Sequence, residues 1–302
     1  IEDLRIDFED GYGTRDDGTE DADAIRAARA LPDTPYVGLR VKSFDTAALR
    51  RRSIRTLDLF LSTVADRIPP GLLITFPKVT DVRQIAVFVT VLERLETNLG
   101  LPAGTLVFEI QVETTQAIVD SAGQVTLPGF IAAGQGRVRG LHFGTYDYTA
   151  GVGLPSASQH LAHAACDFAR HIMQVSAAGT GIWCSDGSTN ILPVGDPDAI
   201  QHGWHTHATL VRRALDHGFY QGWDLHPNQL VTRYATVYRF YRDGLPEATA
   251  RLANYLNHRA GSVADEPATA RMLAAFLLRA RRCGAIDEDE LPVGQDRLLG
   301  LL

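Results

Sequence analysis

Short apolar runs alternate with segments of helix length along the first 230 residues of this chain. The runs are rich in β-branched and aromatic residues and are bounded by turn-forming residues, which is typical of strands. The predicted strands are 4–10, 36–42, 72–78, 105–114, 138–149, 179–187 and 222–230. The predicted helices between them are 21–30, 54–66, 81–99, 115–121, 157–176 and 200–217. Strands that alternate with helices of this length indicate βαβ units and a parallel sheet.

The spacing of these units favours a (β/α)8 TIM barrel over a doubly wound open sheet. Crossovers of roughly 30 to 40 residues recur regularly, as they do in such barrels. A doubly wound sheet usually carries a GxGxxG phosphate turn after its first strand, and the stretch EDGYGTRDDG after the first run does not fit that motif. Because only seven strands are found, we expect the first strand of the barrel to lie upstream of residue 1. We predict a catalytic barrel domain over residues 1–235.

Beyond residue 235 the strand pattern stops. Amphipathic helical patterns take over, and they predict a C-terminal helical extension over residues 236–302. A Gly/Ser/Asp segment at 260–266 is expected to separate two helices of this extension.

The composition excludes several classes of protein. A chain of 302 residues with 45% hydrophobic residues can bury a large core without disulfides. Its three cysteines, Cys166, Cys184 and Cys283, form no CxxC pair, which fits a reducing cytoplasm. A formal net charge of −7 argues against nucleic acid as a partner, and no apolar run approaches the length of a bilayer span. We therefore expect a cytoplasmic protein with neither a nucleic-acid nor a membrane partner.

Several predicted strands have one apolar face and one charged face. Apolar side chains alternate with ionisable or polar ones in LRIDFED (4–10) and in FEIQVE (108–113). In a barrel wrapped by helices the apolar face packs under the helices, so the charged face must look inward. An unpaired ion there would cost several kcal/mol, so these charges must be paired, hydrated or bound to a metal ion.

Side chains near the carboxyl ends of barrel strands reach the open mouth, where barrel enzymes keep their active sites. Six ionisable residues fall at such ends: Glu9, Asp10, Arg40, Lys78, Glu113 and Asp147. A structural ion network is the simpler interpretation for Arg5, Asp7 and Glu109, which lie deeper along their strands. Carboxylates without matched histidines favour Mg²⁺ or Mn²⁺ over zinc, and an arginine fork suits a substrate carboxylate or an enolate oxygen. The strand ends thus predict an anionic substrate held partly by a divalent cation.

Six segments resemble successive motifs of the citrate lyase beta-subunit, malyl-CoA lyase and HpcH/HpaI aldolase family, which belongs to the phosphoenolpyruvate/pyruvate superfamily. The segments are LRIDFEDG, VGLRVKSFDT, TFPKVTD, IQVETTQAI, LHFGTYDYTAGVG and WDLHPNQL. They occur in order over residues 4–230, one at each of six strand ends. The resemblance implies a (β/α)8 barrel that uses Mg²⁺ or Mn²⁺ to make or break a carbon–carbon bond.

The same resemblance implies roles for the residues at the strand ends. Glu113 and Asp147 would be the metal ligands. Arg40 would bind the substrate oxygen and stabilise the enolate, while Glu9 and Asp10 would hold metal-bound water or transfer protons.

The remaining implied residues are Lys78, which would line the mouth, and Gly144, Thr145 and Tyr146, which would bind the substrate. The activity implied is that of a carbon–carbon lyase of class EC 4.1. It would cleave or condense a small keto or hydroxy carboxylate, or its CoA thioester, through a metal-bound enolate. The family also implies a homo-oligomer, a trimer or a hexamer.

The sequence also departs from the family pattern. Asp10 stands where the aldolase branch keeps a histidine, which favours the lyase branch, and no CoA-binding signature is evident. Three alternatives stay open: an oxaloacetate-type decarboxylase, an acyl-CoA thioesterase, and a non-catalytic barrel that binds a ligand.

Histidines are expected to have structural roles. His142 alternates into the barrel, where a hydrogen-bonded interior histidine is the simpler interpretation. For His202, His205 and His207 a helix-terminal or loop cluster is favoured over a zinc site, because no nearby carboxylate completes a typical set of ligands.

Overall fold

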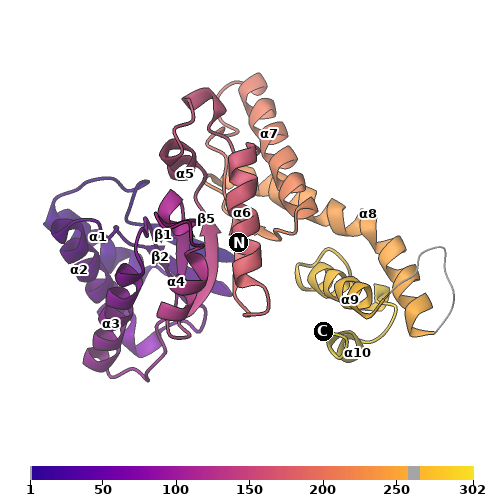
Figure 1. The fold of residues 1–302 in the computed structure, drawn as a ribbon, viewed down its shortest axis with the longest axis horizontal. Coiled ribbons are helices and arrows are strands. Elements are labelled where there is room, and N and C mark those ends of the chain that lie inside the picture. Colours follow the sequence, from indigo (N-terminus) through magenta and orange to yellow (C-terminus); the bar gives the residue numbers. More distant parts are fainter. Residues whose placement is uncertain (1, 258–265) are drawn as a thin grey trace. The chain divides into compact units, whose positions relative to one another are not determined.

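The structure is a computed structural model that describes residues 2–257 and 266–302. In this part of the chain, seven parallel strands form one sheet in sequential order (Figure 1). The strands are β1 Asp3–Asp7, β2 Tyr36–Arg40, β3 Leu72–Phe76, β4 Phe108–Val112, β5 Val138–Phe143, β6 Trp183–Asp186 and β7 Gln221–Gly222. A doubly wound sheet reverses its strand order at a switch point, whereas this sheet curls in one direction as part of a barrel. The predicted barrel-type α/β fold is confirmed.

Helices follow successive strands of the sheet. They are α1 Asp17–Arg29, α2 Ala47–Val64, α3 Val82–Leu99, α4 Leu127–Ala133, α5 Thr145–Gly151 and α6 Ala164–Ala177. The side chains of Asp16, Thr46 and Asp81 accept hydrogen bonds from amides in the first turns of α1, α2 and α3. These caps satisfy amides that the helices leave free, so each long helix starts at a defined residue after its strand.

Side-chain contacts between strands that are not neighbours show which face of the sheet is concave. Arg5 on β1 pairs with Glu109 on β4, with 3.1 Å between Nε and Oε1. Arg40 on β2 donates to Gln111 on β4, at 3.3 Å. Side chains from strands this far apart in the sheet meet only inside its curl. The polar face therefore looks inward, as the alternating pattern predicts.

The apolar face packs under the helices. Phe76 of β3 stacks on Phe88 of α3 with ring centroids 4.2 Å apart, and Phe44 and Phe108 contact the same pair edge-on. All four rings are buried. Aromatic rings bury large areas in such edge-on and stacked contacts, so this cluster anchors α3 to the centre of the sheet.

The predicted strand at 138–149 is too long. The strand ends at Phe143, and α5 begins at Thr145. The aromatic and threonine residues of TYDYT favour strands by propensity, but backbone bonds from Tyr148 to Gly144 and from Val152 to Tyr148 close helical turns instead. Asp147 therefore sits on a short helix at the end of the strand.

Other predicted elements are also shorter than expected. The predicted helix at 115–121 is a single 3₁₀ turn, Thr115–Ala117, because Asp120 accepts hydrogen bonds from the amides of residues 122 and 124 and closes a turn. The predicted helix at 157–176 begins only at Ala164. The predicted strand at 222–230 is reduced to β7, and a 3₁₀ turn with Pro227 at its start follows.

The chain divides into two compact units. The first runs up to Ser188 and includes Tyr220–Trp223, so it contains the whole sheet. The second comprises Thr189–Phe219 and Asp224–Leu302. Its helices are α7 Pro197–Asp216, α8 Leu230–Leu256, α9 Pro267–Arg282 and α10 Gln295–Leu299. The predicted domain boundary at residue 235 falls inside α8 and stays a prediction, and residues 260–265 of the predicted separating segment lie outside the described residues.

In the second unit a buried histidine joins α7 to α8. His202, His205 and His207 all lie within α7, not in a loop. His207 is buried, and its ring nitrogens lie 2.7 Å from Thr232 and 2.7 Å from Asp224. Arg233 pairs with the same Asp224 carboxylate at 2.9 Å. These contacts assign His207 a structural role.

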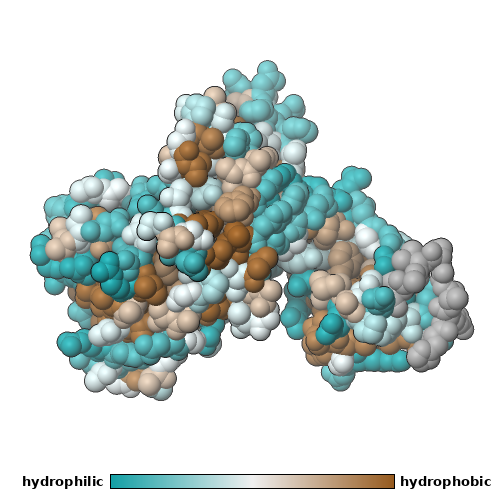
Figure 2. Space-filling model, viewed as in Figure 1, coloured by the Kyte–Doolittle hydropathy of each residue, from teal (hydrophilic) through white to brown (hydrophobic). Residues whose placement is uncertain are grey.

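The surface is largely hydrophilic on the face shown in Figure 2, with apolar side chains gathered over α6. Phe168 and Val175 of this helix are exposed. Among the described helices, none combines the length and the apolar character that crossing a membrane requires.

Candidate functional site

The six ionisable strand-end residues come together at one end of the curled sheet. The Lys78 ammonium lies 2.9 Å from Asp10, 3.0 Å from Asp147 and 3.3 Å from Glu9. The Lys78 backbone N–H donates to Glu113 Oε1 at 2.8 Å. Arg40 joins through Glu9, with 3.6 Å between Nη1 and Oε2. Direct contacts thus connect all six residues in one cluster at the carboxyl ends of the strands.

Glu113 is the most deeply buried carboxyl group of this cluster. Only 1% of the residue is exposed, and Oε2 accepts a hydrogen bond from Gln111 at 2.5 Å. Burial raises the pKa of Glu113 to about 8; the Lys78 ammonium opposes this shift, and repulsion from Asp147 adds to it. Gly144 leaves room for the side chain, because a Cβ at that position would collide with Glu113 Cβ and lie 2.8 Å from Oε2.

Lys78 adopts a backbone conformation that is uncommon for a residue with a side chain. Its φ is +50°, in the left-handed region, which costs of order 1–3 kcal/mol and tends to occur at functional sites. This conformation turns the amide toward Glu113 while the ammonium contacts Asp10 and Asp147. Burial lowers the pKa of Lys78, but the surrounding carboxylates outweigh it and raise the pKa well above its usual value.

Arg40 is held by a carboxylate that the sequence pattern assigned to a structural network. Asp7 accepts the guanidinium fork at 2.8 Å from Nε and 2.5 Å from Nη2. The same carboxylate accepts the backbone N–H groups of Glu9 at 2.9 Å and Gly11 at 2.8 Å. Asp7 therefore orients Arg40 and also shapes the loop that carries Glu9.

Gln111 is a second residue of the site that the sequence analysis did not single out. It is buried, and it accepts a hydrogen bond from Arg40 while donating one to Glu113. The signal for it was its place on the inward face of β4, two residues before Glu113. Gln111 links the cationic and the acidic parts of the cluster.

Glu9 and Asp10 are adjacent carboxyl groups with different proton affinities. Burial raises the pKa of Glu9 to about 7, with Lys78 and Arg40 opposing the shift and Asp10 adding to it. Burial also acts to raise the pKa of Asp10, but hydrogen bonds with Lys78 and Glu9 outweigh it and lower the pKa. Paired carboxyl groups whose pKa values are pushed apart are suited to separate acid and base roles.

Lys42 fixes the loop between β1 and α1, on which Glu9 and Asp10 lie. Its ammonium donates to the Phe8 carbonyl at 2.6 Å and to the Gly13 carbonyl at 3.3 Å. It also pairs at 3.1 Å with Glu20, a fully buried carboxylate on α1. The loop is therefore tied at both ends by one cation.

Deeper in the curl, Arg5 and Glu109 form a buried pair, to which Thr75 adds a hydrogen bond of 2.5 Å. Neither residue reaches the strand ends, and both are satisfied by their own partners. Their geometry is that of a structural ion pair.

The predicted substrate-binding residues lie beside Glu113. Gly144 follows β5 and donates its N–H to the Val112 carbonyl at 2.9 Å. Thr145 and Tyr146 open α5, and the Thr145 hydroxyl is buried without a hydrogen-bond partner. Their binding of a substrate stays a prediction.

The donor set of the cluster fits a hard divalent cation. Within residues 2–257 and 266–302, no three His, Cys, Asp or Glu side chains are arranged to hold a metal ion by themselves. However, Mg²⁺ is commonly bound by one or two carboxylates together with waters and substrate oxygens. Glu113 and Asp147, both in contact with Lys78, offer such oxygens, and Gly144 packs closely against Glu113. Their binding of Mg²⁺ or Mn²⁺ stays a prediction.

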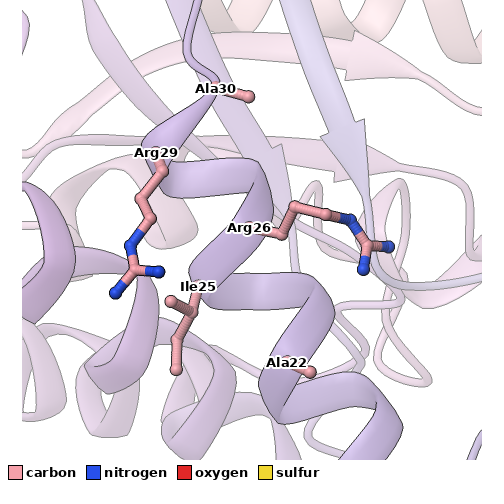
Figure 3. Close-up of a pocket in the computed structure, with 5 residues that line it drawn as sticks. All are labelled: Ala22, Ile25, Arg26, Arg29 and Ala30. Carbon is pink, nitrogen blue, oxygen red and sulfur yellow. The ribbon is translucent and has the colours of Figure 1, made fainter.

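A separate surface hollow lies on the outer side of α1 (Figure 3). It is lined by Ala22, Ile25, Arg26, Arg29 and Ala30. In a βα unit the helix runs back from the strand ends, so this C-terminal part of α1 lies away from the mouth. The hollow contains no carboxylate and none of the predicted site residues.

Comparison with solved structures identifies several that share this fold. A citrate lyase from Burkholderia xenovorans LB400 is 23% identical and has a TM-score of 0.73, over 96% of this chain and 87% of that chain. CitE from Mycobacterium tuberculosis, in complex with magnesium, acetoacetate and coenzyme A, is 18% identical and has a TM-score of 0.61, over 91% of this chain and 88% of that chain. Haloferax volcanii malate synthase, in complex with magnesium and glyoxylate, is 16% identical and has a TM-score of 0.60, over 78% of this chain and 65% of that chain. The fold expected from the motif resemblance is therefore confirmed.

Comparison with curated protein sequences finds no match. A family model, described as "Domain of unknown function (DUF6986)", matches residues 1–298, and the chain therefore belongs to this family.

Proposed function

We propose that this protein is a carbon–carbon lyase or condensing enzyme for a small keto or hydroxy carboxylate, free or as its CoA thioester. The observation that carries the proposal is the meeting of Arg40, Lys78, Glu113 and Asp147 with Glu9 and Asp10 at one end of the curl. The solved structures of similar fold include a citrate lyase, a CitE protein and a malate synthase, which supports this class of chemistry.

Arg40 would bind the oxygen on which negative charge develops when the carbon–carbon bond breaks or forms. Its guanidinium is fixed by Asp7 and Gln111 before any substrate arrives. A donor that is already oriented stabilises a developing enolate without reorganising, which is the largest contribution in many enzymes.

Glu9 would hold or transfer the proton of the reaction. A carboxyl group with a pKa of about 7 exchanges protons readily at neutral pH, whereas its neighbour Asp10 stays ionised. Lys78 would neutralise the carboxylates around the substrate and keep the mouth accessible to an anion.

Glu113 and Asp147 would hold Mg²⁺ or Mn²⁺, and such an ion polarises a carbonyl oxygen as a Lewis acid. Magnesium accompanies the ligands in the CitE and malate synthase structures. The use of CoA belongs to the same proposal and is tested with it, whereas the predicted homo-oligomer stays a prediction.

Isothermal calorimetry with Mn²⁺ tests the assignment of the metal ligands. Glu113→Gln should weaken Mn²⁺ binding by at least about tenfold, with circular dichroism unchanged. Glu109→Gln is the matched control, because Glu109 lies on the same face of the same strand but pairs with Arg5. Equal Mn²⁺ affinity in wild type and Glu113→Gln would contradict the assignment.

Product analysis tests the reaction class. Keto and hydroxy acids, with and without CoA, should give pyruvate, an aldehyde or acetyl-CoA in a reaction that chelation stops. Release of CO₂ alone would indicate a decarboxylase, and release of free CoA alone a thioesterase. Either of these products would refute the proposed carbon–carbon lyase.

A further inference from the structure

Trp223 follows the last strand of the sheet and lies at the same end of the curl as the ionisable cluster. Residues Ser185 and Asp186 of β6 pair in register with Gln221 and Gly222 of β7. The Trp223 N–H continues this ladder to the Asp186 carbonyl at 3.4 Å. The position of Trp223 is thus set by the sheet itself, although sequence reasoning assigned it no role.

The Trp223 ring contacts both His142 and Arg40 on the inner face of the sheet. It stacks on His142 of β5, with ring centroids 3.9 Å apart and 14° between the planes. The Arg40 guanidinium carbon lies over the Trp223 ring, 5.7 Å from its centroid. A cation within about 6 Å of an indole face is attracted by the ring, and more strongly where water is excluded.

His142 supports the ring as a neutral base. It is buried, and Nδ1 lies 3.1 Å from the Ser185 hydroxyl, in accord with the predicted interior histidine. Burial lowers the pKa of His142 well below its usual value, and repulsion by Arg40 and Arg5 acts in the same direction. The His142 ring that stacks on Trp223 therefore carries no charge that would repel Arg40.

We propose that Trp223 is a positioning residue: its indole holds the Arg40 guanidinium toward the substrate and forms an apolar wall of the substrate site. Asp7 and Gln111 hold Arg40 by accepting hydrogen bonds from its N–H groups, and Trp223 restrains the guanidinium by a cation–π contact with the face of the indole ring. A planar carboxylate or enolate bound to Arg40 would lie next to this wall. The inference rests on the proposed function, because it assigns Arg40 to the substrate.

Oxalate is a suitable probe, because it is a planar dianion with the shape of the enolate of pyruvate. Binding of oxalate with Mg²⁺ is measured by calorimetry on the full chain. Trp223→Leu should weaken oxalate binding about 5- to 30-fold, and Trp223→Phe, which keeps a ring, by less than about threefold. Trp183→Leu is the matched control, because it also removes an indole from the sheet but near Gly140 and Tyr36, at the start of β6.

Two further measurements separate positioning from a merely structural role. In an Arg40→Met background, Trp223→Leu should change oxalate affinity by a smaller factor than in the wild type, since the part of its effect that acts through Arg40 is lost there. Oxalate should also change the tryptophan fluorescence of the wild type but not of Trp223→Phe, which keeps only Trp183 and Trp204. The fluorescence measurement on the wild type and Trp223→Phe decides the matter if Trp223→Leu does not fold.

The outcomes distinguish this inference from the proposed function. If the wild type fails to bind oxalate with Mg²⁺, the proposed function is overturned and the inference with it. If the wild type binds but Trp223→Leu binds within twofold of it, or the fluorescence change persists in Trp223→Phe, only the inference is overturned.

Discussion

Asp7→Asn measures how much the hydrogen bonds of Asp7 to Arg40 and to the backbone contribute to the free energy of unfolding. Each carboxylate oxygen of Asp7 accepts one hydrogen bond from Arg40 and one from a backbone amide, of Glu9 at Oδ1 and of Gly11 at Oδ2. Whichever way an asparagine amide turns, its nitrogen faces two donors, so one bond to Arg40 and one to the backbone are lost. A hydrogen bond to a charged group contributes about 1.5–3 kcal/mol and an ordinary one about 1 kcal/mol.

The expected cost follows from these values and from exposure. The side chains of Asp7 and Arg40 are 29% and 11% exposed, so solvent screens part of the lost interaction. We expect Asp7→Asn to lower the free energy of unfolding by about 2–3 kcal/mol. For a urea m-value of about 2–3 kcal/mol/M, the unfolding midpoint falls by about 1 M.

Asp81 provides a matched control on the surface. It accepts the same fork from Arg83, at 2.9 Å and 2.6 Å, together with a backbone amide, but the Arg83 side chain is 84% exposed. Asparagine caps helices as well as aspartate does, so Asp81→Asn should leave the urea midpoint unchanged within error. Equal shifts for the two variants would refute the reasoning that burial gives the Asp7 fork its strength.

The pH dependence of the Asp7→Asn effect has a defined sign. Burial raises the pKa of Asp7, but the bonds from Arg40 outweigh it, so the folded-state pKa is lowered. A carboxyl with a lowered pKa contributes its full stability above its unfolded value, about 3.9, and loses it as the pH falls through the folded value. The difference between wild type and Asp7→Asn should therefore stay constant from pH 7 to 5 and shrink below about pH 4.

Two more predictions concern the glycine beside Glu113 and the buried histidine of the second unit. Gly144→Ala should weaken Mn²⁺ binding at least about tenfold in calorimetry, because the new Cβ collides with Glu113. Gly151→Ala is the control and should leave Mn²⁺ binding unchanged, because its new Cβ meets Thr115 at an ordinary contact distance of 3.6 Å. Burial raises the pKa of Asp224, but hydrogen bonds with His207 and Arg233 outweigh it and lower the pKa. Asp224→Asn should therefore lower the midpoint of urea unfolding at pH 6 to 7, and the difference in midpoint between wild type and variant should shrink below about pH 4. A difference that grows in acid would contradict the stabilising role of the ionised Asp224 carboxylate.

The strands and the cluster were predictable because both depend on local pattern. Alternation of period two marks an inward face, and the last inward residue of a strand must lie at the mouth, as Arg40 and Glu113 do. The same logic placed Asp7 deeper and gave it a structural role. The structure instead pairs Asp7 with Arg40 in register on the neighbouring strands β1 and β2, so Asp7 lies level with Arg40 and accepts its guanidinium fork.

Gln111 and Trp223 illustrate what the pattern alone does not show. Gln111 is on the predicted inward face of β4. Its bridging role also requires that Arg40, on β2, lie within hydrogen-bond distance while Gln111 donates to Glu113 at the end of its own strand. Trp223 contacts His142 only because the sheet is curled, since β6 separates their strands. Such contacts between distant strands arise from the closure of the sheet, which no single segment specifies.

The charge balance of the cluster connects its stability to its chemistry. Five carboxyl side chains meet two cationic ones: Asp7, Glu9, Asp10, Glu113 and Asp147 against Arg40 and Lys78. Arg40 is engaged mainly by Asp7 and approaches Glu9 only at 3.6 Å, so the Lys78 ammonium is the principal cation among the other four carboxyl groups. Burial, and after it the excess negative charge, raise the pKa values of Glu9 and Glu113, because the protonated carboxyl group carries no charge and so relieves both costs. A divalent cation would relieve the same excess without protonating the carboxyl groups, and an anionic substrate adds to the excess unless such a cation accompanies it. The acidity of the mouth therefore supports the proposal that this site works with a cation and its substrate together.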